Sequence, residues 1–330
     1  MSVLVLLLLA RAVALLTWSS LGHAGAVLGW LAGSVLRIRR GAVEAAMTRA
    51  AVNDPRAEAS AMYRGLGEGV FELLWLAGVS AERRAEALGK HVRLDEDLEG
   101  ALIAAAERGP VILAASHTGN WELIAYGAAQ VLAKHGRRLA VVVKPQSVGV
   151  FHAFCMNLRE ACGLVLIEPR GALAAARRCL AAGDVIAMPI DQVPDRRRHG
   201  LEVPFLGAAA LADRAPAALA RATGATLLVV AASRDGRLQR GHLLAELVEL
   251  VEPVEPAAPA APAPPTASAW IENATRDATR ALETFVSARP GSWLWLHRRW
   301  RAPLELQAST RARTRMGATS RPLVVTGHPG

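Results

Sequence analysis

Residues 111–126 read VILAASHTGNWELIAY, and this stretch decides the fold. A short apolar run ends at Ser116, a Gly-Asn turn follows, and an apolar pattern resumes at Trp121. The pattern predicts a buried strand, a tight turn and a helix. Strand, turn and helix in that order are typical of an α/β fold.

Two titratable side chains flank the predicted turn. His117 would stand at the carboxyl end of the strand, where open α/β sheets form their ligand crevices, and Glu122 in the first turn of the helix. A carboxylate near an imidazole raises its basicity and fixes its tautomer, so the pair suits a general base acting on a hydroxyl. A single histidine near a single glutamate is more often structural, and both interpretations stay open on composition alone.

The string HTGNWE at residues 117–122 resembles the signature of the bacterial lipid A late acyltransferases of the lauroyl/myristoyl type. That family lies within the glycerolipid acyltransferase superfamily, which shares a His-x4-Asp/Glu motif. The resemblance extends over roughly residues 10–305 and includes the string WLHRRW at 295–300. It implies that His117 and Glu122 are catalytic, with Glu122 orienting the ring of His117.

The rest of the chain alternates between strand-like and helix-like segments. We expect strands at 139–143, 164–167, 185–190, 226–231 and 242–251, and helices at 151–162, 172–182, 211–223 and 269–288. This alternation predicts an α/β fold with a mainly parallel mixed sheet flanked by helices, in one domain over residues 41–305.

The resemblance also implies residues that bind substrate. Arg170 follows the predicted strand 164–167, and in the superfamily the arginine of this block grips the phosphate of the acceptor. Asp191 and Gln192 follow the next strand and would line the acceptor side of the crevice. Lys144 stands where relatives have an arginine, which gives it a weak binding role because the bidentate geometry is lost.

An acyl transfer needs N–H donors for its oxyanion, and the turn at Gly119 and Asn120 and the start of the following helix are both candidates. We include Asn120 among the residues expected to contact substrate.

Residues 292–300 read SWLWLHRRW and interleave aromatic with basic residues. Indoles favour the membrane interface and arginines favour lipid head groups, so Arg298 and Arg299 are candidate lipid contacts. A segment that packs its tryptophans into the core explains the pattern equally well.

The composition and net charge agree with an enzyme that binds a membrane. The chain has 330 residues, 52% of them apolar, and a net charge of +9. The apolar surplus suggests contact with lipid, and the mostly arginine charge suits phosphate and anionic lipid surfaces. The sequence has no zinc finger, helix-turn-helix or aromatic RNA-binding string, so we expect no nucleic-acid partner.

No metal or redox cofactor is implied. Cys155, Cys162 and Cys179 lack metal-type spacing, and we expect buried thiols in a reducing compartment.

Residues 1–40 are expected to form an N-terminal membrane anchor. Residues 12–36 carry no formal charge over 25 positions, and the basic string RIRR at 37–40 follows at once. A bilayer span needs about 20 apolar residues, and the basic flank places the next segment in the cytoplasm. Spanning and lying in the interface both stay open, and a cleaved signal peptide is the rival interpretation. The predicted location is the cytoplasmic face of the bacterial inner membrane.

Two further segments fall outside regular structure. Residues 252–266 form a Pro/Ala-rich insert, and residues 306–330 form a polar, basic tail that we expect to be disordered.

The predicted function is transfer of a fatty acyl chain from acyl carrier protein to a hydroxyl of a lipid A precursor, within lipopolysaccharide biosynthesis. Direct attack on the thioester is expected because no Gly-x-Ser-x-Gly elbow is present. A coenzyme A donor stays open, as does another glycolipid or phospholipid acceptor such as a mannosylated phosphoinositide. The alternative of a different class is a membrane-tethered lipid-binding protein without catalytic activity.

Overall fold

The computed structural model describes residues 3–143, 149–168, 170–194, 197–234, 243–251 and 266–300. Lys144, nearly all of the insert 252–266 and the tail 306–330 lie outside the described residues. The expectations for them, and the domain boundaries drawn from them, stay predictions.

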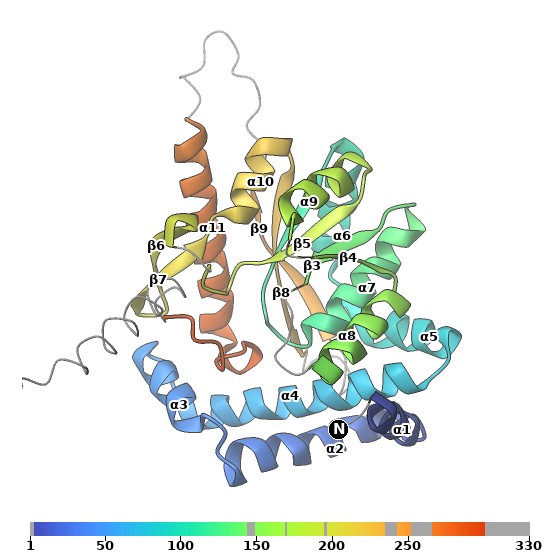
Figure 1. Ribbon diagram of the computed structural model, residues 1–330. Helices are drawn as coiled ribbons and strands as arrows, with labels where there is room; N and C mark the ends of the chain where they lie inside the picture. The colour runs from blue at the N-terminus through green and yellow to red at the C-terminus, as the bar shows by residue number, and fades with distance from the viewer. Residues whose placement is uncertain are drawn as a thin grey trace, which may run out of the picture.

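The described chain is built around a seven-stranded sheet with the order β1-β9-β8-β2-β5-β3-β4 (Figure 1). Every neighbouring pair is parallel except β8 and β9, which are antiparallel. The prediction of a mainly parallel mixed sheet flanked by helices is therefore confirmed. The strands are β1 (Val92–Leu94), β2 (Val111–Ala115), β3 (Leu139–Val142), β4 (Leu164–Ile167), β5 (Val185–Pro189), β8 (Thr226–Arg234) and β9 (Leu243–Val251).

Helices cover both faces of the sheet, which explains why β2 reads as an unbroken apolar run. Side chains alternate along the strand, so Ile112 and Ala114 face one core while Val111 and Leu113 face the other. The first core is closed by α9 (Ala172–Ala181), α10 (Ala215–Thr223) and α11 (Ala267–Ala288). The second is closed by α5 (Ala81–His91), α6 (Glu96–Arg108), α7 (Trp121–Lys134) and α8 (Gly149–Ala161).

A β-hairpin replaces the start of the helix predicted over residues 211–223. Strand β6 (Gly200–Phe205) pairs antiparallel with β7 (Ala208–Asp213), and α10 begins only at Ala215. The two-residue loop between the strands, Leu206 and Gly207, has φ of 48° and 75°. Two positive φ angles are what a type I′ hairpin turn requires, and the alanine-rich composition of β7 hid the strand.

The N-terminal region folds into several helices rather than one long helix. These are α1 (Val3–Val13), α2 (Trp18–Trp30), the π-helix η1 (Leu31–Val35), α3 (Arg40–Arg49) and α4 (Pro55–Gly78). The uncharged run 12–36 is thus broken between Val13 and Trp18, which corrects the expectation of a single anchor helix. Within the described residues no single helix has the length and apolarity to cross a membrane. One pair of segments, Trp18–Val35 and Arg40–Arg49, is long and apolar enough only when the two are taken together, and it is bent by 86°.

Helix α4 lies beneath the carboxyl edge of the sheet and carries α2 on its far side (Figure 1). The two backbones approach closely: a Cβ on Gly29 would lie 2.2 Å from the Tyr63 carbonyl oxygen, and one on Gly67 would lie 2.0 Å from that of Gly25. Such contacts tolerate only glycine, so the sequence of both helices is adapted to this packing. Helix α2 is therefore part of the folded domain.

Candidate active site

The turn HTGNWE connects β2 to α7, as the sequence predicts. Strand β5 lies beside β2 in parallel, with Ala115 opposite Pro189. Two residues beyond each of these positions stand His117 and Asp191. Parallel strands end at the same edge of the sheet, so the two side chains meet although they are far apart in the sequence.

Asp191 binds His117 through both carboxylate oxygens. Its Oδ1 lies 2.8 Å from Nδ1 of His117, and its Oδ2 accepts the backbone N–H of the same residue at 2.7 Å. Trp293 donates its Nε1–H to Oδ2 at 3.0 Å. The Asp191 side chain is fully buried, whereas that of His117 keeps 16% of its surface exposed. An ionised Asp191 therefore selects the tautomer of neutral His117 with the proton on Nδ1 and leaves Nε2 as a proton acceptor.

The pair shifts the protonation equilibria of both groups. Burial lowers the pKa of His117, but the charge of Asp191 and its hydrogen bond outweigh burial and raise the pKa above its ordinary value. Burial raises the pKa of Asp191, yet His117, with a smaller contribution from His297, holds it well below its usual range. Asp191 stays ionised when His117 gains a proton.

The carboxylate of Glu122 is bonded to residues other than His117, and the ring-orienting role that the resemblance implies stays a prediction. Its carboxylate is paired with Arg159 on α8, whose Nε donates to Oε2 at 2.9 Å and whose Nη2 contacts Oε1. Tyr126 donates its hydroxyl to the same carboxylate at 3.1 Å. Glu122 thus ties α7 to α8, and its charge makes only a smaller contribution to the raised pKa of His117.

Asn120 is buried and holds the turn in place. Its Oδ1 accepts the N–H of Leu123 as the N-cap of α7, and its Nδ2 donates to Glu72 on α4 at 2.8 Å. Glu72 is also bound by two nitrogens of Arg234 at the end of β8, at 2.8 and 3.0 Å. These contacts hold Asn120 to other parts of the protein, and the expected contact of Asn120 with substrate stays a prediction.

The segment Ser292–Leu294 packs directly on the HTG part of the motif. Gly119, with φ of +57°, donates its N–H to the Ser292 carbonyl at 2.8 Å, and His117 accepts the N–H of Leu294 at 3.0 Å. The Gly119 amide is therefore already bonded, which argues against its proposed use as an oxyanion donor.

Trp293 and Trp295 are almost wholly buried, at 0% and 2% exposure. For these two tryptophans the core interpretation of residues 292–300 is confirmed.

The other predicted substrate residues divide into two groups. Gln192 lies close to the imidazole, with its Nε2 3.4 Å from Nε2 of His117. Arg299 is buried and donates Nη1 to the carbonyls of Gln192 at 3.2 Å and Leu211 at 2.9 Å. Arg170 is exposed in the turn after β4, a strand that lies three positions from β2 in the sheet order. The structure does not bring Arg170 together with His117.

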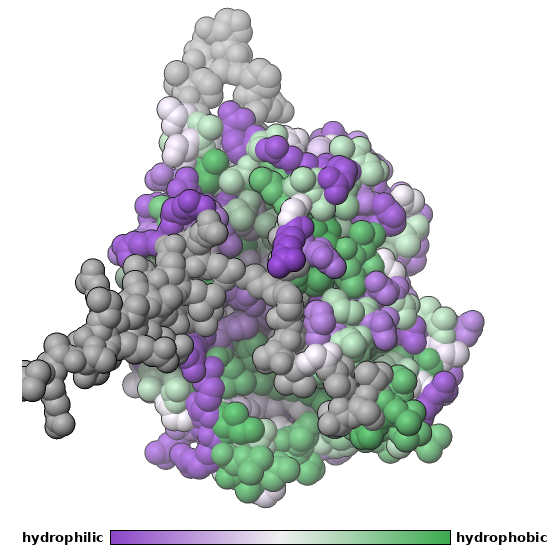
Figure 2. Space-filling model, viewed as in Figure 1, coloured by the Kyte–Doolittle hydropathy of each residue, from purple (hydrophilic) through white to green (hydrophobic). Residues whose placement is uncertain are grey.

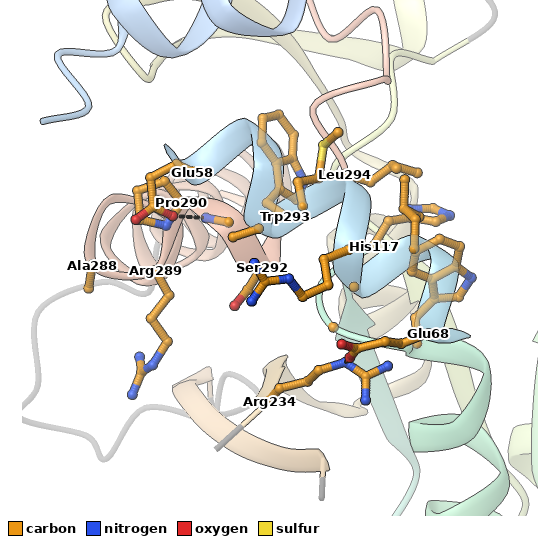
Figure 3. Close-up of a pocket in the computed structure, with 18 residues that line it drawn as sticks. Glu58, Glu68, His117, Arg234, Ala288, Arg289, Pro290, Ser292, Trp293 and Leu294 are labelled. Carbon is orange, nitrogen blue, oxygen red and sulfur yellow. Dashed lines mark hydrogen bonds and ion pairs between the residues drawn. The ribbon is translucent and has the colours of Figure 1, made fainter. Parts of the chain in front are cut away.

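Two cavities adjoin the His117–Asp191 pair. The first has a volume of about 350 Å³ and lies between α4 and the segment 288–294 (Figure 3). His117 reaches it from one side, and Arg234 and Glu68 border it from another. The second, of about 330 Å³, is lined by Asp191 and Gln192, and by four basic residues described below.

His117, Asp191 and His297 are the described residues best placed to hold a metal ion, with ligand atoms within 4.8 Å of one another. Both oxygens of Asp191 already accept hydrogen bonds, so an ion would have to displace the Nδ1–H of His117. The arrangement fits a hydrogen-bonded base better than a metal centre, and the absence of a metal stays a prediction.

Sequence reasoning missed several residues around the site. Arg159, Glu72 and Arg234 carried no signal, because single charged residues on helices and strand ends usually face solvent. His297 lies within the string WLHRRW, in which sequence reasoning singled out only the neighbouring arginines. Its ring packs edge-on against that of His117, with 4.4 Å between the ring centroids. Trp293 was assigned to the core or the membrane, and its bond to Asp191 was not foreseen.

Comparison with known families decides the class of the protein. The profile of the family described as bacterial lipid A biosynthesis acyltransferase matches residues 2–302. The chain belongs to this family. The match confirms the resemblance carried by HTGNWE and WLHRRW, and it makes the protein an acyltransferase with a lipid A-type acceptor. No curated protein matches the sequence.

Proposed function

We propose that this family member transfers a fatty acyl chain from acyl carrier protein to a hydroxyl of a lipid A precursor, with His117 as the general base. The observation that carries the proposal is the bond between Nδ1 of His117 and buried, ionised Asp191. That bond leaves Nε2 to accept a proton and gives the imidazolium a counter-charge that costs no reorganisation during the reaction.

The reaction begins when Nε2 of His117 takes the proton of the acceptor hydroxyl. The hydroxyl oxygen attacks the thioester carbonyl carbon and forms a tetrahedral intermediate. The carbon–sulfur bond then breaks, and the leaving thiolate takes the proton back from His117. The products are an ester and the free thiol of the carrier, and Asp191 remains ionised throughout.

In this proposal Glu122 is a positioning residue. Its pairing with Arg159 and Tyr126 fixes the first turn of α7 against α8. Because that turn follows His117 directly, the pairing supports the geometry of the base without touching substrate.

An apolar surface formed by the N-terminal helices supports membrane docking. Most exposed large apolar residues of the described chain lie on α1, α2 and η1 and in the links that join these helices to one another and to α3. Figure 2 shows this apolar surface along the lower edge of the molecule. They include Leu8 at 61%, Leu15 at 87%, Trp30 at 60% and Leu36 at 62% exposure. Contiguous apolar surface of this kind is typical of contact with a membrane or a partner. We propose that these helices lie in the interface at the cytoplasmic face of the inner membrane.

The test is transfer in vitro, followed by mass spectrometry of the product lipid. Purified protein in phospholipid vesicles is given acyl carrier protein loaded with a fatty acid and a lipid A precursor. We expect the mass of one added acyl chain with the wild type and its loss with His117→Ala. Transfer that survives His117→Ala would contradict the proposed base, and transfer to a mannosylated phosphoinositide alone would contradict the proposed acceptor.

A further inference from the structure

The second cavity is markedly basic. Arg39, His297, Arg298 and Arg299 line it together with Asp191, Gln192, Val193 and Leu296. Asp191, the acidic residue of this lining, is fully buried and already bonded to His117 and Trp293. The lining thus combines four basic side chains with a single carboxylate, that of Asp191.

Arg299 is the most unusual member of the lining. Its side chain has only 1% exposure, and within the described chain its Nε and Nη2 atoms have no hydrogen-bond partner. Burial lowers its pKa to about 10, although Asp191 and Asp213 oppose the shift. A buried guanidinium normally has its donors paired, because unpaired buried charge is costly. Arg299 lines the cavity from behind, so its charge adds to the positive potential that an anion in the cavity would meet.

Arg39 reaches the cavity from the N-terminal region. Its backbone lies in the left-handed region with φ of 54°, as does that of Arg37 at 49°. This conformation is strained for a non-glycine residue, and such strain clusters at functional sites. It turns the chain sharply before α3 and lets Nη1 of Arg39 contact the carbonyl of Leu296 on the cavity wall.

The same arginine adjoins the apolar surface described above. Leu36 and Ile38, at 62% and 49% exposure, lie within three residues of Arg39. A ligand held by Arg39 would therefore combine an anionic head group with a lipid body.

From these observations we infer that the second cavity is a phosphate site for a substrate of the reaction. The inference rests on the proposed function, because Gln192 joins this cavity to Nε2 of His117. Planar guanidinium groups bind phosphate oxygens in pairs, which suits Arg39 and Arg298 as direct ligands and Arg299 as the buried charge behind them. Two substrates carry phosphate: the acceptor lipid and the phosphopantetheine arm of the carrier. The neighbouring apolar residues favour the acceptor.

A binding experiment tests the site without any turnover. Inorganic phosphate is titrated into the full-length protein while its thermal unfolding temperature is followed, since a ligand of the native state stabilises it by mass action. The variants are the double substitution Arg39→Gln/Arg298→Gln, which changes two exposed residues, and Arg280→Gln, a matched change of an exposed arginine on α11. We expect phosphate to raise the unfolding temperature of the wild type and of Arg280→Gln. At the same phosphate concentration, the rise in the double variant should be at least tenfold smaller.

A kinetic experiment then identifies the source of the phosphate. Each protein is assayed with the phosphorylated acceptor and with the same lipid after phosphatase treatment, using acyl carrier protein and, separately, acyl-pantetheine as donors. We expect the double variant to raise KM for the phosphorylated acceptor about tenfold or more, because charge-assisted hydrogen bonds are lost, and to leave KM for the dephosphorylated acceptor unchanged. If KM instead rises only for acyl carrier protein and stays unchanged for acyl-pantetheine, the site binds the phosphopantetheine arm of the donor.

The inference is overturned if the double variant responds to phosphate like the wild type and shows unchanged KM values for all four substrates. A wild type that binds phosphate at this site but transfers no acyl chain would overturn the proposed function, while the site itself would stand. Arg299→Lys, which keeps the charge, serves as a further check: we expect it to retain more of the phosphate response than Arg299→Gln.

Discussion

Asp191 Oδ1 lies 2.8 Å from Nδ1 of His117, although 74 residues separate the two in the sequence. The contact exists because β5 is the parallel neighbour of β2, so the residues that follow the two strands meet at one edge of the sheet. It gives His117, the proposed base, a carboxylate partner.

Substitution of Asp191 by Asn should lower kcat by about two to four orders of magnitude, the usual range for general-base catalysis. It should also change the pH profile. His117 must be neutral to accept a proton, and Asp191 raises its pKa, so wild-type activity rises with pH through an inflection above the ordinary value of about 6.5. Without the negative charge, the inflection should move to lower pH. Initial rates between about pH 5 and 9 measure both effects. The control is Asp277→Asn on α11, a half-buried aspartate that pairs with Arg280. If the low-pH inflection of Asp191→Asn coincided with that of the wild type, the proposal that Asp191 raises the pKa of the catalytic His117 would be contradicted.

Substitution of Glu122 by Gln should act mainly on stability. It leaves Arg159 without its carboxylate in a buried setting, and breaking such a pair costs about 3–5 kcal/mol. The double variant Glu122→Gln/Arg159→Met should lose less than the sum of the two single changes, because the pair is already broken. Chemical denaturation measures these free energies. If Glu122 instead acted on the ring of His117, Glu122→Gln would move the acid limb of the pH profile as far as Asp191→Asn does.

The close packing of α2 on α4 predicts opposite effects for two glycines of one helix. Gly67→Ala should destabilise the protein, because the new Cβ would lie 2.0 Å from the Gly25 carbonyl oxygen and force the helices apart. Gly65→Ala meets nothing within 4 Å and should raise stability by about 0.5–1 kcal/mol, since alanine favours the helix. Thermal unfolding of the two variants checks the pair. Equal effects would show that α2 does not depend on this contact.

Membrane docking through the N-terminal helices can be tested with polar substitutions at exposed leucines. Leu8→Ser and Leu36→Ser should each weaken binding to anionic vesicles, because a leucine buried in lipid contributes about 1.5–3 kcal/mol. Leu173→Ser is the matched control, since Leu173 has 57% exposure but lies on α9, away from these helices. Vesicle co-sedimentation measures the binding. A control that weakens binding as much as the two test variants would remove the support for docking through this face.

Local sequence patterns determined much of the architecture. The apolar run before HTGNWE predicted β2, the Gly-Asn turn predicted the break, and the spacing of later strands predicted the parallel sheet, because these features depend on residues near one another in the chain. The two-stranded hairpin of β6 and β7 was missed for the same reason. Its alanines fit a helix locally, and only the positive φ of Leu206 and Gly207 and the pairing across the turn make them a strand.

His117, the proposed base, could be singled out from the sequence, since it and its turn form one continuous motif. Only the tertiary structure decided the partners. Asp191 reaches His117 because two strands are neighbours in the sheet, and Glu122 binds Arg159 because α8 packs on α7. Arg39 and Arg299 line one cavity because the chain bends before α3. Proximity between distant segments depends on packing, and no local pattern of residues encodes which carboxylate of the chain will lie against the imidazole.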